Sequence, residues 1–234
     1  MADSGSSLGS LFAAAWAISR KDVVIELRSR EIVYLTLFFA VSCVLVFAFS
    51  FVRDGRAPEE SGPAILWIAV AFAGTLALNR TFERERASAT LPVLLLAPCE
   101  RPAIYLGKLM ALLLLMGAVE VVLVPLVSLM FGAPFFEHPL GMVLLLGLGT
   151  LGFAAVGTLF AAMLGRAHSR EALLPILLYP MTVPVMIAGV RGTASLLEGA
   201  EGAALVRAWI GMLVFFDVVF LTLALWTFEA VMTE

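Results

Sequence analysis

Charged residues are scarce in this sequence: lysine, arginine, aspartate and glutamate together make up 14% of its 234 residues. Hydrophobic residues make up 62%, and the mean hydropathy is +1.03, so too few polar side chains exist to cover a water-soluble globule. The sequence therefore predicts an all-α integral membrane protein. A net charge of −3, with the cations spread among loops, argues against nucleic acid as a partner.

Cysteine and histidine are also rare, with two of each. Cys43 lies in an apolar run and Cys99 in a charged loop, which predicts two free thiols rather than a disulfide. His138 and His168 fall on opposite sides of the predicted membrane domain, so they cannot share a metal ion or a haem iron. The chain has no Ser-His-Asp, Cys-His or zinc-ligand spacing, so we expect no catalytic residue and no metal site in it.

Six apolar runs are each long enough, alone or with flanking helix, to cross a bilayer. They cover residues 32–52, 62–79, 109–131, 140–165, 172–190 and 208–228, which predicts one transmembrane domain over residues 1–234. The fourth run repeats small residues at Gly157, Ala161 and Gly165, a face suited to close helix packing. The fifth contains three prolines, which predicts a kinked helix enclosed by protein. Residues 191–207 predict two short helices broken between Gly199 and Gly202.

The segment before the first run has the pattern of an amphipathic helix. We expect residues 1–10 to be irregular, because they are small and polar. Beyond them, apolar residues recur at helical spacing with Lys21 and Arg28 on the opposite side, which favours a helix in the membrane interface. A plain extension of the first span is the alternative. The apolar stripe consists of Phe12, Trp16, Val23 and Leu27.

The distribution of lysine and arginine predicts the orientation of the chain. Eleven of the fifteen fall on one side of the predicted spans, which places both termini and the loop 80–108 in the cytoplasm. These eleven are Arg20, Lys21, Arg28, Arg30, Arg80, Arg84, Arg86, Arg101, Lys108, Arg166 and Arg170. The other side has Arg53, Arg56, Arg191 and Arg207.

The loop between the second and third spans, residues 80–108, carries five of the fifteen basic residues. It opens with charges of alternating sign, and the preceding span can continue as helix to Ala87. Thr90 as an N-cap and Pro92 in the first turn then predict a short apolar helix that ends at Pro98. Such a helix needs a cover, which is either the bilayer surface or a groove on another protein. The residues that would contact a partner are Phe82, Glu83, Arg84, Glu85, Arg86, Leu91, Leu94, Leu95 and Pro98.

Three segments of the sequence resemble the haem exporter protein B (CcmB) family, which belongs to the type-2 ABC exporter membrane subunits. The segments are Leu66–Ala69 (LWIA), Leu78–Glu85 (LNRTFERE) and Leu94–Lys108 (LLLAPCERPAIYLGK). The layout of the chain resembles the family over nearly its whole length. Ala89 departs from the wider exporter class, in which many members have glycine before the Thr-Leu pair.

The resemblance implies a membrane subunit, present in two copies, in a bacterial cytoplasmic membrane. A separate CcmA-like ATPase would drive it, so that Phe82–Arg86 and Leu91–Pro98 transmit the closure of that ATPase to the spans. CcmC-like and CcmD-like membrane proteins and a CcmE-like haem chaperone would complete the complex. It would export haem or release the haem-loaded chaperone during cytochrome c maturation.

The chain has no nucleotide site of its own by sequence. Gly107-Lys108 is its only Gly-Lys pair, no glycine stands five residues earlier, and Leu109 occupies the position of the magnesium-binding Ser or Thr. ATP would therefore act only through a partner, and the chain itself is not an enzyme. Two alternatives stay open at this point: a type-2 ABC exporter for another lipid-like or drug-like substrate, and a proton-coupled carrier.

Two carboxylates, Glu120 and Asp217, fall near the middle of their spans, where insertion of an ionised group costs about 2.5–3.5 kcal/mol. Hydrogen bonding between helices is the plainer interpretation, and a substrate or proton pathway is the sharper one. On the outer side, His138 beside Phe135 and Phe136 is a candidate haem contact, although an ordinary loop histidine is the plainer interpretation.

Overall fold

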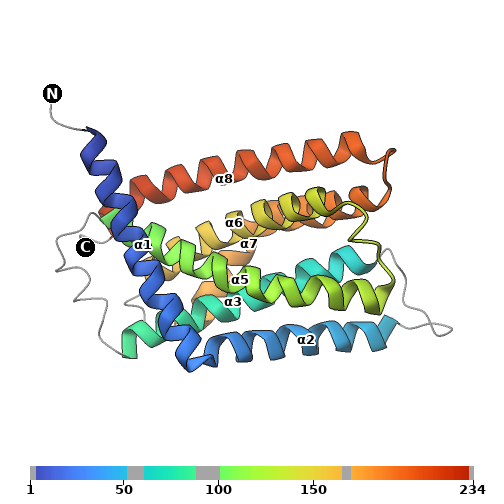
Figure 1. Cartoon of the computed structure of the whole chain (residues 1–234), viewed down its shortest axis with the longest axis horizontal. Coiled ribbons are helices and arrows are strands. Elements are labelled where there is room, and N and C mark those ends of the chain that lie inside the picture. The colour runs from blue at the N-terminus through green and yellow to red at the C-terminus, as the bar shows by residue number, and fades with distance from the viewer. Residues whose placement is uncertain (1–3, 52–60, 88–100, 165–169, 232–234) are drawn as a thin grey trace.

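The computed structural model describes residues 4–51, 61–87, 101–164 and 170–231, and these residues form seven helices and no strand (Figure 1). All of the helices except α1 are long and apolar enough to cross a membrane. The predicted all-α architecture with six long apolar helices is therefore confirmed. In chain order the helices are α1 Ser4–Ser29, α2 Glu31–Phe51, α3 Gly62–Ala87, α5 Arg101–Phe131, α6 Pro139–Met163, α7 Arg170–Leu197 and α8 Ala203–Val231.

The six long helices run up and down in one bundle, and α1 lies across one end of it (Figure 1). We call this end the loop end, because α3 ends there at Ala87 and α5 begins there at Arg101. The opposite end is the turn end, where residues 132–138 connect α5 to α6 and residues 198–202 connect α7 to α8. Helix α1 packs mainly against α5.

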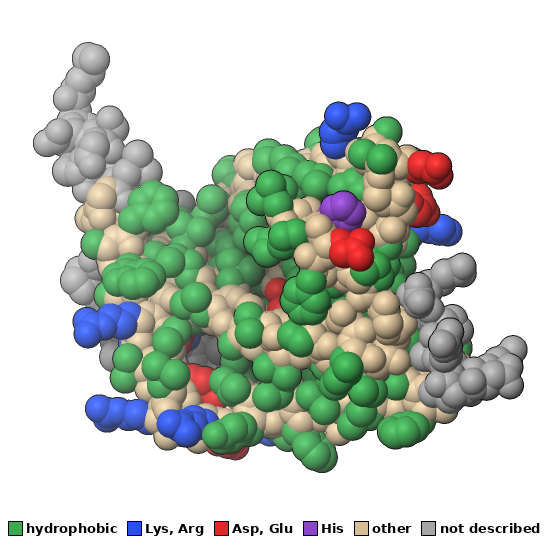
Figure 2. Space-filling view, turned by 45° about the vertical axis from the view of Figure 1, so that its right-hand side comes forward, with side chains coloured by type: hydrophobic (Ala, Val, Ile, Leu, Met, Phe, Trp, Pro, Cys, Tyr) green, Lys and Arg blue, Asp and Glu red, His purple; other side chains and the backbone are tan. Residues whose placement is uncertain are grey.

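Burial differs between the centre and the edges of the bundle. Most of the apolar stretch is buried in α3 and α6, whereas α2 and α8 expose most of theirs and lie on opposite sides in Figure 1. Figure 2 shows hydrophobic side chains over most of one face, with charged side chains mainly at its two ends. An apolar belt of this kind suits a hydrocarbon environment, in which a helix satisfies its own backbone hydrogen bonds.

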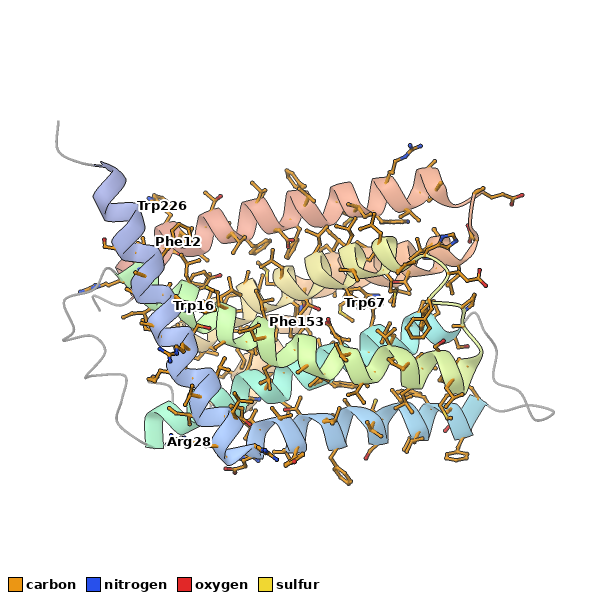
Figure 3. All side chains as sticks on the ribbon, viewed as in Figure 1. Phe12, Trp16, Arg28, Trp67, Phe153 and Trp226 are labelled. Atoms are coloured by element: carbon orange, nitrogen blue, oxygen red, sulfur yellow. The ribbon has the colours of Figure 1, made fainter. Side chains whose placement is uncertain are left out.

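Glycines allow the central helices to approach each other closely. A Cβ built on Gly157 of α6 would lie 2.4 Å from Cδ1 of Leu78, so α3 packs on α6 there. Ala161 is buried too, which confirms the predicted small-residue face at these two positions, while Gly165 lies outside the described residues. Toward the turn end, the indole of Trp67 fills the space beside Gly149 and Gly189 (Figure 3).

The predicted pair of short helices in residues 191–207 is wrong. Helix α7 continues to Leu197 and α8 begins at Ala203, so both arms are continuous with the spans. The arm of α7 stays helical because its buried side chains, such as Thr193 and Leu196, extend the buried face of the span. The predicted break does occur, at Gly199, which adopts φ 64°.

Two further expectations are corrected. Residues 4–10 are helical rather than irregular, because they form the start of α1. Helix α7 is not enclosed by the other helices of this chain, since Ile176, Met181 and Ile187 are exposed, and it stays helical across its three prolines. Its buried side chains instead recur along one face at helical spacing, which leaves the other face to lipid. They are Leu174, Leu178, Val185 and Ala188.

Candidate coupling site at the loop end

Of the predicted partner-binding residues, the structure places the backbone of Phe82–Arg86 at the loop end of the bundle. Phe82–Arg86 belong to the last turns of α3, whose helix runs to Ala87 as predicted. Their side chains, and the whole segment with Leu91, Leu94, Leu95 and Pro98, lie outside the described residues. The site is therefore described by the helices on either side of the loop, above all by the first two turns of α5.

Tyr105 fixes the start of α5 to α6. Its side chain is fully buried, and its hydroxyl donates a hydrogen bond of 3.0 Å to the carbonyl oxygen of Ala155. Two residues further along α6, Gly157 receives Leu78 of α3. The helix that enters the loop and the helix that leaves it therefore both rest on one short segment of α6.

Gly107 brings α5 close to α1. A Cβ at this position would lie 2.8 Å from the carbonyl oxygen of Ala15 and 2.8 Å from Cβ of Ile18. Real Cβ contacts are longer than this, so any other residue would force the two helices apart. The glycine of the sequence motif YLGK is thus explained by the close crossing of α1 and α5, and a phosphate-binding role is not needed to explain it.

Lys108 forms a buried ion pair with α1. Its ammonium group lies 2.5 Å from Oδ2 of Asp22, and the two side chains are only 3% and 15% exposed. The second carboxylate oxygen of Asp22 lies 3.0 Å from the ammonium group of Lys21, whose side chain is 38% exposed. Removing one partner of a buried pair typically costs about 3–5 kcal/mol, because the other charge is left without compensation.

Helix α1 is also joined firmly to α2. Arg30, the only residue between these helices, adopts φ 54° and donates its backbone N–H to the carbonyl oxygen of Glu26. The carboxylate of Glu26 in turn accepts the backbone N–H of Val33 at 2.9 Å, which caps the first turn of α2. The change of direction between the two helices is therefore held by hydrogen bonds from both sides.

The predicted stripe on α1 faces away from α5. Phe12, Trp16 and Leu27 are exposed, whereas Val23 is half-buried. The residues that pack on the bundle are Ala15, Ile18 and Ser19 on the opposite side of the helix. Figure 3 shows Phe12 and Trp16 at the same end of the molecule as Trp226 of α8.

The two intramembrane carboxylates have different surroundings. Glu120 of α5 is buried and accepts a hydrogen bond from the hydroxyl of Thr150 on α6, which supports the hydrogen-bonding interpretation for this residue. Asp217 of α8 is buried beside Gly152, and neither of its carboxylate oxygens has a hydrogen-bond partner within the part of the chain that the structure describes. Thr150 and Gly152 are two residues apart on α6 and therefore point to nearly opposite sides of that helix.

His138, the candidate haem contact, lies at the turn end of the bundle. His138 is exposed at the start of α6, with Phe135 buried and Phe136 exposed next to it. Cys43 is a half-buried free thiol, whereas Cys99 and His168 lie outside the described residues. Across residues 4–51, 61–87, 101–164 and 170–231, no three His, Cys, Asp or Glu side chains gather as metal ligands would.

Sequence reasoning missed Asp22. The apolar stripe and the cations of α1 predict only an interfacial helix, and Lys108 enters the sequence patterns as a loop cation and as part of the Gly-Lys pair. The available signal was an acidic residue directly after Arg20 and Lys21, in a segment with several basic residues. Nothing local in the sequence indicates which lysine this carboxylate meets.

Comparison with known proteins identifies the family. The family model described as CcmB protein matches residues 13–233, which is almost the whole chain. The chain belongs to the CcmB family. It is therefore a transmembrane permease subunit without an ATPase domain of its own, as the resemblance implied.

Individual CcmB relatives align over most of their length. The heme exporter protein B of Bradyrhizobium diazoefficiens is 26% identical over 78% of this chain and 82% of the relative. The protein of the same name from Pseudomonas aeruginosa is 26% identical over 78% of this chain and 81% of the relative. The one from Haemophilus influenzae is 25% identical over 73% of this chain and 76% of the relative.

Proposed function

We propose that this chain is the membrane subunit of an ABC transporter complex for cytochrome c maturation. In this complex it couples ATP hydrolysis by a separate CcmA-like ATPase to haem export or to release of a haem-loaded chaperone. The match to the CcmB family over residues 13–233 carries the proposal. The lack of a phosphate-binding loop in the sequence agrees with a partner ATPase.

The loop end is the docking site for the ATPase in this proposal. Arg84 and Arg86 alternate with acids there, and a charged helix end can pair with a complementary surface. The segment Leu91–Pro98 would be the coupling helix, and α1 the interfacial helix of a type-2 exporter. Exposed Trp16 and Trp226 at this end support an interfacial position, because tryptophan concentrates at the level of the headgroups.

The proposed assembly has two copies of this chain in a bacterial cytoplasmic membrane, with both termini and the loop end in the cytoplasm. CcmC-like and CcmD-like proteins and a CcmE-like chaperone are the further partners. A proton-coupled carrier is less favoured, because Glu120 contacts Thr150 and Asp217 lies beside Gly152, two positions that point to nearly opposite sides of α6.

The proposal is tested in a strain whose gene for this chain is deleted. We expect that haem staining detects no c-type cytochromes in the deletion strain and that the intact gene restores them. Glu83→Ala with Arg84→Ala should lower both the restored level and the amount of ATPase retained by the purified membrane subunit. The matched control is Glu198→Ala with Arg191→Ala, which removes the same charges from exposed positions at the turn end.

Two results would contradict the proposal. Normal c-type cytochromes in the deletion strain would remove the role in cytochrome maturation and leave an exporter of another substrate. Full retention of the ATPase by the Glu83 and Arg84 double variant would instead remove the assignment of the docking site.

A further inference from the structure

Helix α1 contacts both α5, which begins at the loop, and α2, the first span. A mechanism that couples the ATPase to the spans has to connect the movements of these two helices. Helix α1 crosses the start of α5 directly after the loop, and it passes into α2 through the single residue Arg30 (Figure 1). Both attachments include specific polar contacts. The chain therefore has a direct structural connection from the loop to α2 that bypasses the centre of the bundle.

The attachment to α5 resists sliding and rotation. The close approach at Gly107 leaves no space between α1 and α5, and the ion pair between Lys108 and Asp22 lies next to it on the same helix turn. A steric contact fixes the distance between two helices, whereas a buried ion pair fixes their register and rotation. Together these contacts make α1 and the first turns of α5 move as one body.

The attachment to α2 is equally well defined, whereas the rest of α2 packs on α3 and α5 through apolar and small side chains. Arg30 and Glu26 fix the angle between α1 and α2 through backbone hydrogen bonds. Beyond this joint, α2 is buried along a single narrow stripe of mostly small side chains. The stripe consists of Ile32, Thr36, Ala40, Val44 and Ala48. A helix held at one end and packed along one smooth stripe can follow its attached end without breaking a polar contact.

We propose that α1 transmits movement of the first turns of α5 to α2. The ion pair between Asp22 and Lys108 is the contact that couples α1 to α5 in this movement. Lys108 and Asp22 are thus positioning residues for the ATP-driven step and do not contact nucleotide or substrate. The inference rests on the proposed function, because it needs an ATPase that moves the loop. It assigns a mechanical role to the Gly-Lys pair at the start of α5.

The first test compares two lysines that contact the same carboxylate. Lys108→Met keeps the length of the buried side chain but removes its charge, and Lys21→Met does the same at the more exposed partner of Asp22. We expect Lys108→Met to retain the ATPase and to lower the yield of c-type cytochromes at least tenfold per retained ATPase. Lys21→Met should lower that yield less than twofold. Equal yields for the two variants would overturn the inference.

The second test exchanges the charges, so that it does not depend on the folding of one variant. Asp22→Lys and Lys108→Asp should each abolish the cytochrome yield, and the double exchange should restore at least a third of it. A double variant that reaches the membrane at the normal level without restoring the cytochrome yield would overturn the proposed role of α1. In that case the ion pair would be re-formed, but the ATP-driven step would still fail.

The third test measures movement directly in the purified complex with its ATPase. Spin labels replace Phe38 of α2 and Met163 of α6, both exposed, after Cys43 and Cys99 have been changed to serine. Binding of a non-hydrolysable ATP analogue should shift the distance between the labels in the otherwise unchanged chain but not in the Lys108→Met variant. The double charge exchange should show the shift again. The same shift in Lys108→Met would overturn the inference. A parent chain that binds no ATPase would instead refute the proposed function.

Discussion

The two ends of the bundle are held together in different ways. At the turn end, large side chains such as Trp67, Phe131 and Phe135 are fully buried against small residues, and the hydrogen bond from Trp67 to Thr193 adds to the packing of the indole. At the loop end, single polar contacts connect separate helices, namely Tyr105 to Ala155 and Lys108 to Asp22. Apolar packing distributes its energy over many atoms, whereas a polar contact concentrates it in one place. The turn end is therefore built for stability, and the loop end for defined connections between helices.

The largest expected effect tests the turn end. Trp67→Ala would remove a fully buried indole that fills the space beside Gly149 and Gly189 and donates a hydrogen bond of 3.0 Å to Thr193. We expect a loss of about 3–5 kcal/mol in the free energy of unfolding, because the cavity cannot close around two glycines. Thermal unfolding of the purified chain in detergent measures this loss.

Trp226→Ala is the control for this prediction. Its side chain is 79% exposed, so its removal should change the unfolding temperature in detergent very little. Equal destabilisation by the two substitutions would show that burial at the turn end is not what holds the bundle together.

The next effect tests the helix crossing at the loop end. Gly107→Ala would place a methyl group 2.8 Å from the backbone of Ala15, so α1 has to move outward. Overpacking of this kind costs about 1–3 kcal/mol, which the same unfolding measurement detects. Gly117→Ala on the same helix is the control, because no atom lies within 4 Å of the added carbon. If both substitutions were neutral, the close approach of α1 and α5 would be refuted.

The smallest effect tests a single hydrogen bond. Tyr105→Phe would remove the hydroxyl that donates to the carbonyl oxygen of Ala155 and leave the ring in place. Hydrogen bonds between membrane helices contribute about 0.6 kcal/mol on average, so a loss of that size is expected. Tyr34→Phe, at an exposed position on α2, should give no change. The unfolding temperatures of the two variants and the unsubstituted chain in detergent measure this difference. Equal unfolding temperatures would show that the Tyr105 hydroxyl does not contribute to stability.

The spans could be predicted because a run of uncharged residues longer than the bilayer has few alternatives to a helix. The start of α5 could be predicted as well, since Pro102 is suited to the first turn of a helix, and α5 begins at Arg101. The arms around Gly199 were predicted as separate helices because local apolar patterns do not reveal that Thr193 and Leu196 extend the buried face of a longer helix. A local sequence pattern thus indicates that a segment is helical, but it does not indicate whether that segment is continuous with the neighbouring span.

The connections at the loop end could not be predicted from the sequence for a similar reason. Charged residues such as Asp22 and Lys21 are typical of a helix face that is exposed to water. Only the three-dimensional crossing of α1 over α5 buries Lys108 against Asp22. The motif YLGK indicated that this segment matters, but it did not indicate that Tyr105 contacts α6 while Gly107 and Lys108 contact α1.

The pairing of Asp22 with Lys108 also sets an order of events during synthesis. The two residues are 86 positions apart in the chain, so Asp22 leaves the ribosome long before its partner exists. At about 5–20 residues per second, the delay is roughly 4 to 17 seconds. During this time α2 and α3 are made while Asp22 has no Lys108 to pair with, so α1 takes its final position only after α5 has been made. The N-terminal helix is thus among the first segments to be made and among the last to reach its final place.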